Sequence, residues 1–180
     1  MKKLIALLLT LSLCAFAFGA MAEEVKITED ADSFDISVIV PEGYTLGEST
    51  MENEIAITDF TPDDPAAKPN ITLVVAYSEE YEGMSMTKDM SDEDIKALYG
   101  VVDDSYNSDN YTVGVTDDGW KYLQVVDNEE ENGYAAFIMI HNGYFIEVAV
   151  MFDDFRPLDD FDFSDVTKLL DSYVITDIDK

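Results

Sequence analysis

Six aspartates crowd into the segment DDFRPLDDFDFSD near the C-terminus. They are Asp153, Asp154, Asp159, Asp160, Asp162 and Asp165. Carboxylate oxygens are the ligands that hard divalent cations prefer, so these residues are the candidate metal site, with calcium as the ion. Acidic runs of this kind are more often solvated surfaces. We therefore predict no cofactor and keep a calcium site on these aspartates as the alternative.

A second acidic stretch, DNEEENG over residues 127–133, has the outline of a calcium-binding loop. An EF-hand loop needs short oxygen-bearing side chains at its third and fifth positions and a glycine at its sixth. Here glutamates stand at the third and fifth positions, and the glycine is the seventh residue. The pattern therefore indicates an acidic connection between strands and not an EF-hand.

The sequence has few histidine and cysteine residues that could take part in catalysis or bind a metal. His141 is the single histidine and Cys14 the single cysteine, so zinc sites of the familiar kind cannot be built. His141 precedes the turn pair Asn142-Gly143, and no G-x-S-x-G segment offers a nucleophile to it. We interpret it as an exposed polar residue beside a hairpin turn and not as a catalytic base. A hydrolase with paired carboxylates is a third alternative, because the many acidic residues do not single out a pair.

Two further residues allow two interpretations each. Trp120 follows an Asp-Gly pair and is either a cross-strand packing residue or a platform for a ligand. Arg156, the single arginine, is either a structural clamp for the neighbouring aspartates or a holder of an anionic ligand. We favour the structural interpretation for both.

The first 22 residues have the composition of a cleaved export signal. Two lysines precede an apolar run, and the segment AMA fits the signal-peptidase pattern, which predicts cleavage between Ala22 and Glu23. Cys14 would make the chain a lipoprotein, but bulky Leu13 stands where a small residue is expected. We therefore predict secretion, or another extracytoplasmic location, without a membrane anchor.

The charge balance limits the partners. The chain has 39 acidic and 10 basic residues, which gives a formal net charge of −29. Nucleic acids and anionic membrane surfaces should repel such a chain, so we predict neither as a partner. Solubility is the simplest explanation of the acidity, and binding of a cationic partner or a divalent metal is the functional alternative.

Hydrophobic periodicity predicts the elements that must position these residues. After a polar, flexible lead-in over residues 23–32, one domain is expected over residues 33–180. Strands are expected over 34–40, 53–60 and 71–77, where apolar residues alternate or run together. A helix is expected over 91–102 with Ser91 as its N-cap, and another over 163–174 with Ser164 as its N-cap.

The pairs Asp118-Gly119, Asn132-Gly133 and Asn142-Gly143 predict hairpins and so four antiparallel strands between the two helices. For the middle pair, a longer loop over 128–133 is the alternative. A two-residue turn at Asn142-Gly143 sets His141 opposite Tyr144, with Met139 opposite Ile146 and Phe137 opposite Val148. Both faces of this hairpin are largely apolar, so helices are expected on both.

The predicted fold class is therefore α+β, with an antiparallel sheet of about six to seven strands flanked by two helices. The segment FDISVIVPEGY, with Phe34, Ile36, Val40, Pro41, Gly43 and Tyr44, resembles the start of the PsbP-like family of bacterial envelope and secreted domains. The resemblance covers about residues 32–175. It implies an α/β/α sandwich and a non-enzymatic role in binding or assembly, and it brings no catalytic residues.

These features together predict a secreted, non-enzymatic acidic domain that binds or assembles with a protein or peptide. The alternative is a divalent-cation-binding protein of the envelope or exterior.

Overall fold

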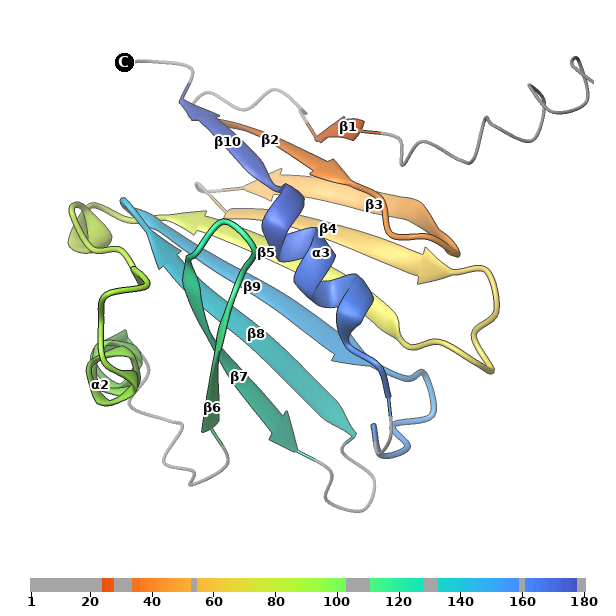
Figure 1. Cartoon of the computed structure of the whole chain (residues 1–180). Helices are drawn as coiled ribbons and strands as arrows, with labels where there is room; N and C mark the ends of the chain where they lie inside the picture. Colours follow the sequence, from red (N-terminus) through yellow and green to blue (C-terminus); the bar gives the residue numbers. More distant parts are fainter. Residues whose placement is uncertain are drawn as a thin grey trace, which may run out of the picture.

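The computed structural model describes residues 24–27, 34–52, 55–102, 111–127, 133–158 and 161–177. The predicted cleavage residues Ala22 and Glu23 lie outside these ranges, as do Asp159 and Asp160. The fold is α+β, and its main element is a seven-stranded antiparallel sheet (Figure 1). The strands of this sheet, in spatial order, are β3 (Tyr44–Glu52), β4 (Ile55–Pro62), β5 (Asn70–Tyr77), β9 (Tyr144–Met151), β8 (Tyr134–His141), β7 (Lys121–Asp127) and β6 (Tyr111–Val115).

A second, three-stranded sheet lies beside the first. It has the order β1 (Glu24–Ile27), β2 (Phe34–Ile39) and β10 (Val174–Asp177), and its pairs are antiparallel. The predicted strand over 34–40 is thus present, but it belongs to this small sheet. Strands β1, β3 and β10 were not predicted. β3 lacks an apolar alternation because it is an edge strand with mostly exposed or half-buried residues and a bulge between Leu46 and Ser49.

The two predicted helices are α2 (Asp92–Val102) and α3 (Ser164–Ser172), and a short 3-10 helix, η1 (Glu79–Tyr81), precedes α2. Ser91 caps α2 as predicted, because its Oγ accepts a hydrogen bond from the amide of Asp94 at 3.1 Å. The prediction for Ser164 was wrong. Phe163 occupies the N-cap position of α3, and Ser164 is the first helical residue.

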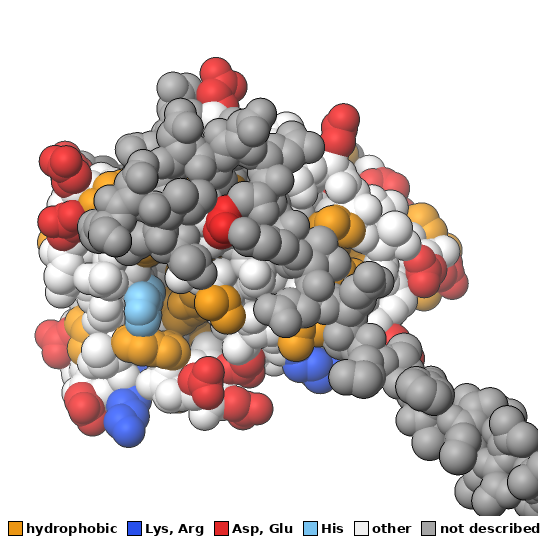
Figure 2. Space-filling model, turned by 90° about the horizontal axis from the view of Figure 1, so that it is seen from above, with side chains coloured by type: hydrophobic (Ala, Val, Ile, Leu, Met, Phe, Trp, Pro, Cys, Tyr) orange, Lys and Arg blue, Asp and Glu red, His pale blue; other side chains and the backbone are white. Residues whose placement is uncertain are grey.

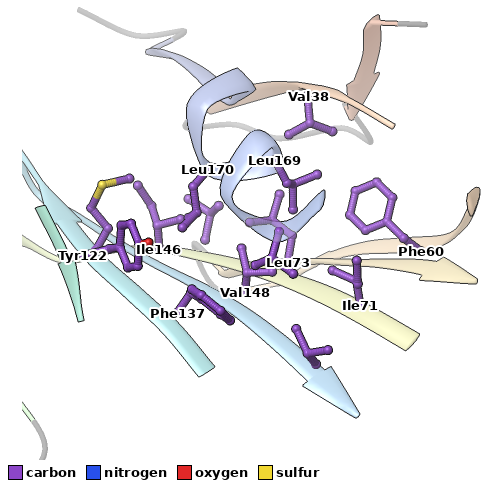
Figure 3. Close-up of a cluster of buried hydrophobic side chains, with 14 of the residues drawn as sticks. Val38, Phe60, Ile71, Leu73, Tyr122, Phe137, Ile146, Val148, Leu169 and Leu170 are labelled. Atoms are coloured by element: carbon purple, nitrogen blue, oxygen red, sulfur yellow. The ribbon is translucent and has the colours of Figure 1, made fainter. Parts of the chain in front are cut away.

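Helix α3 crosses one face of the large sheet and forms the main core with it (Figures 1 and 3). Val166, Leu169 and Leu170 of the helix are buried against side chains from both sheets. The labelled members from the sheets are Val38, Phe60, Ile71, Leu73, Tyr122, Phe137, Ile146 and Val148. Each fully buried aliphatic side chain stabilises the fold by about 1.5–3 kcal/mol.

The opposite face of the sheet has its own, smaller core under α2. It contains Met86, Ile95, Leu123, Val125, Ala136, Ile138 and Ile140. The predicted cover on both faces is therefore present over β7 and β8. On β4 the same face is open, and Ile55 and Ile57 are 42% and 40% exposed.

The three predicted hairpin turns differ in the structure. Asn142 and Gly143 have φ angles of 47° and 94°, and His141 pairs with Tyr144 as predicted. At the first turn only Gly119 has positive φ, so the two-residue prediction was wrong. Thr116 Oγ1 accepts a hydrogen bond from the Trp120 amide at 3.0 Å, which stabilises a longer loop.

The connection between β7 and β8 is the longer loop over 128–133, which was the alternative to a two-residue turn. Asp127, the last residue of β7, pairs directly with Tyr134, the first residue of β8. The six positions between them therefore separate the strands, and a two-residue turn at Asn132-Gly133 is ruled out.

None of the helices in the described ranges has both the length and the apolar content needed to cross a lipid bilayer.

Candidate functional site

A cleft of about 290 Å³ opens where helix α3 ends and β10 begins. Three chain segments meet there: the β6–β7 turn, the β8–β9 turn and the α3–β10 junction. The lining residues are Thr116, Asp118, Trp120, His141, Asn142, Tyr144, Leu170, Asp171, Tyr173, Val174 and Ile175. Figure 2 shows the single histidine at the surface beside hydrophobic side chains, with acidic side chains in the surroundings. This cleft is the candidate functional site.

A short inserted segment sets the spacing of the cleft walls. The amide of Met86 donates to the Ile140 carbonyl, and the amide of Lys121 donates to the Met86 carbonyl, both at 2.9 Å. Isolated bridges pair Ser85 with His141 and Thr87 with Trp120. The segment around Met86 thus lies between the end of β8 and the start of β7, and it holds the backbones of Trp120 and His141 in place.

His141 is packed into this wall and does not project freely. Its ring centroid lies 4.1 Å from that of Trp120, with the planes at 76°, an edge-to-face arrangement. The side chain is half-buried, so the prediction of an exposed residue was wrong, whereas its place beside the hairpin turn was right. Alternation along β8 explains the difference, because His141 shares a face with Phe137 and Met139, which face the α3 core.

The partial burial of His141 determines its protonation state. Desolvation lowers the pKa of the imidazole below 6.5, so the ring is neutral at physiological pH. Its Nδ1 atom is buried and has no hydrogen-bond partner among the described residues. A catalytic histidine is usually oriented by a carboxylate or carbonyl at this nitrogen, and that orienting bond is not made here.

Two tyrosines complete the aromatic walls. Tyr144 packs edge-on against Phe34, with ring centroids 5.2 Å apart, and it also contacts Tyr77 at 5.4 Å. Burial raises the pKa of Tyr173 to about 12, so its phenol stays protonated and can donate a hydrogen bond. The cleft therefore offers aromatic surface together with a phenolic donor.

The charges on the cleft are negative. Asp171 Oδ1 accepts a hydrogen bond from the amide of Asp117 at 2.7 Å, which ties the end of α3 to the β6–β7 turn. Asp118 lies on that turn and is exposed. Among the described residues that line the cleft, none is a lysine or arginine. The electrostatic environment thus favours a cation over an anion.

The structure does not gather the four described aspartates of the predicted metal site. Among the six aspartates, the four described ones have separate partners: Asp153 accepts from Asn70, Asp154 pairs with Arg156, Asp162 accepts from Ser164, and Asp165 binds two lysines. Within the described ranges, no three histidine, cysteine, aspartate or glutamate residues lie close enough together to hold a metal ion.

Asp165 belongs instead to a clamp at the start of α3. Lys68 Nζ donates to Asp165 Oδ2 at 3.0 Å and to the Glu42 carbonyl at 2.7 Å, and it lies 4.8 Å from the centroid of the Tyr44 ring. Burial alone would raise the pKa of Asp165. The hydrogen bonds from Lys68 and Lys168 outweigh it, so the pKa is lowered. The carboxylate is therefore ionised and already paired.

Arg156 forms a second clamp. Its guanidinium carbon lies 3.8 Å from the centroid of the Phe152 ring, and Nη2 donates to the Ala66 carbonyl at 2.6 Å. The ion pair with Asp154 is long, at 3.8 Å. These contacts agree with the structural interpretation of Arg156 and join the segment after β9 to the β4–β5 loop.

Comparison with known proteins assigns no family. No protein-family model matches the chain, and the search of curated proteins finds no match.

The sequence singled out Trp120 and His141 but gave no reason to join them with Tyr173 or Asp171. Alternation on β8 was the one available signal for the inward direction of His141.

Proposed function

We propose that this chain is a secreted, non-enzymatic acidic binding domain of the PsbP-like type. Its partner is a protein or peptide, which engages the cleft through a cationic side chain. The observation that carries the proposal is the composition of the cleft: aromatic walls, two carboxylates and no basic residue among the lining residues.

Aromatic walls suit the long side chains of lysine and arginine. A cation near an aromatic ring is stabilised by about 0.5–2 kcal/mol, and tryptophan is the most effective ring. The apolar stems of these side chains can pack on the tyrosine rings while the charged group meets Asp118 or Asp171. A neutral side chain would gain the packing alone.

The size of the cleft and the net charge of the chain also support a cationic side chain as the ligand. A volume of about 290 Å³ is at the small end of ligand pockets, which favours one long side chain over a large metabolite. The net charge of −29 would also attract a basic partner over a distance and raise its association rate.

The non-enzymatic part of the proposal is supported by the position of the histidine. Its ring packs on Trp120, and the nitrogen that would need an orienting partner has none among the described residues. Secretion and the PsbP-like relationship are supported by the sequence patterns of the leader and of FDISVIVPEGY.

Trp120 makes the test direct, because it is the single tryptophan and lies in the cleft wall. The protein is titrated with N-acetyl-arginine amide, N-acetyl-lysine amide and, as the neutral control, N-acetyl-glutamine amide at constant ionic strength. We expect a saturable change in tryptophan fluorescence with the two cations and a smaller response to the neutral compound.

Two variants make the titration specific. Asp171→Asn keeps a hydrogen-bond acceptor for Asp117 and removes one charge, so it should weaken cation binding by roughly two- to fivefold. Glu48→Gln removes one charge from the exposed edge strand β3 and should leave binding unchanged. Equal responses to all three compounds would contradict the proposal.

A further inference from the structure

The cleft is bordered by the edge of a sheet as well as by side chains. In the order β1-β2-β10, strand β10 has one strand neighbour among the described residues, and that neighbour is β2. Val174 and Ile175 of β10 line the cleft, and Val174 is 54% exposed. In an edge strand, half of the backbone N–H and C=O groups point away from the neighbouring strand. Among the described residues, no second strand pairs with these groups of β10.

The two edges of the large sheet are less suited to pairing. β3, at one edge of the large sheet, carries a bulge between Leu46 and Ser49, which interrupts a ladder. β6, at the other edge, contributes none of its residues to the cleft. β10 is the edge strand that lies beside a set of aromatic and acidic side chains.

We propose that an extended, basic segment of a partner polypeptide adds to the edge of β10 that faces away from β2 and places one lysine or arginine side chain in the cleft. This inference rests on the proposed function and names its binding mode. Main-chain hydrogen bonds to the edge hold the segment, and the cleft selects the side chain.

The dimensions agree with such a segment. β10 has four residues, which span about 13 Å at a rise of roughly 3.3 Å per residue. A bound segment of similar length places alternate side chains on opposite faces, so one side chain reaches the cleft and its direct neighbours do not. Asp171, at the end of α3, and Asp118, on the β6–β7 turn, supply the opposite charge.

The charge pattern excludes a second copy of this chain as the best occupant. A copy would bring its own strong negative charge to an acidic cleft, and like charges in close contact oppose association. A basic segment from another protein has the complementary charge.

The test uses a capped peptide of seven residues in which arginine and valine alternate. An analogue with the same residues and charge carries N-methyl groups on its five central amides, so it cannot donate the main-chain hydrogen bonds. We expect the parent peptide to change Trp120 fluorescence saturably, and the methylated analogue to bind roughly tenfold more weakly or worse. N-acetyl-arginine amide serves as the side-chain control.

Hydrogen exchange gives an independent readout on the protein itself. With the parent peptide, amides within Val174–Asp177 should exchange more slowly, whereas amides of the distant edge strand β3 should not change. Slower exchange at β10 is not expected from N-acetyl-arginine amide, which fills the cleft without pairing to the strand.

The outcomes separate the two proposals. Equal binding of the parent and methylated peptides, with no added protection at β10, would overturn strand addition and leave cleft binding intact. Failure of both the peptides and N-acetyl-arginine amide would overturn the proposed function as well. Protection of β10 that depends on protein concentration without peptide would assign the edge to a second copy and overturn the inference.

Discussion

The turn that carries His141 can be tested through two glycines with different surroundings. Gly143 has φ of 94° and Gly83 has φ of 74°, so a side chain at either position forces an L-residue into the left-handed region. That conformation costs about 1–2 kcal/mol. A Cβ on Gly83 would have no neighbour within 4 Å, whereas a Cβ on Gly143 would lie 2.8 Å from the Tyr77 ring.

The difference in the free energy of unfolding between Gly143→Ala and Gly83→Ala therefore measures the effect of the contact with Tyr77. The ring of Tyr77 cannot shift freely, because its hydroxyl donates to Glu82 at 2.6 Å and its ring packs on Tyr144. An aromatic pair contributes about 0.5–1.5 kcal/mol beyond its buried area. We expect Gly83→Ala to lower the free energy of unfolding by about 1–2 kcal/mol, and Gly143→Ala to lower it by about 1 kcal/mol more.

Urea denaturation followed by circular dichroism measures both changes on the same scale. In thermal denaturation, the extra loss corresponds to about 2–4 °C in the midpoint for a chain of this size. Tyr144 lines the cleft, so Gly143→Ala should also weaken cation binding, while Gly83→Ala should not. Equal losses in the two variants would mean that Tyr77 is not fixed against the turn and would refute the reasoning.

Three further predictions concern the clamp at Asp165, the net negative charge and the predicted export signal. Because the folded state lowers the pKa of Asp165 below 3.8, its pairing with Lys68 stabilises the fold above that pH. This contribution is lost as the pH falls through the folded value, and Asp165→Asn should flatten the dependence of unfolding free energy on pH in that acid range. Sodium chloride from 0.01 to 0.1 M should raise the thermal midpoint by screening self-repulsion, since the Debye length falls from about 30 to about 10 Å. Calcium or magnesium at matched ionic strength should act alike, and a saturable shift with calcium alone would favour the cation-binding alternative. N-terminal sequencing of the protein isolated from its native cells should find Glu23 first if the signal is cleaved as predicted, and a lipid on Cys14 would contradict the prediction.

Local signals predicted the parts of the fold that depend on neighbouring residues. The Asn142-Gly143 turn fixes its own backbone geometry, so the register of β8 and β9 followed from the sequence, including His141 opposite Tyr144. Ser91 likewise caps the helix that it precedes. In both cases the interacting residues are at most a few positions apart.

Pairings between distant segments could not be predicted in this way. β2 pairs with β10, and this pairing sets Val174 opposite Ser37, which is far away in the sequence. β10 has four residues, too few for a clear alternation. The site has the same limitation, because the cleft depends on the inserted segment around Met86 and on the place where α3 ends.

The end of α3 links the stability of the core to the existence of the cleft. Leu169 and Leu170 cover the large sheet, but the chain becomes extended at Tyr173, where φ is −68° and ψ is 141°. The Oγ of Ser172 accepts a hydrogen bond from the Ile39 amide at 3.1 Å, which anchors this junction to the small sheet. From Val174 to Asp177 the chain pairs with β2 and does not continue the helix. Trp120, just before β7, and His141, at the end of β8, therefore line a cleft. The strand at the border of this cleft, β10, has β2 as its one strand neighbour among the described residues.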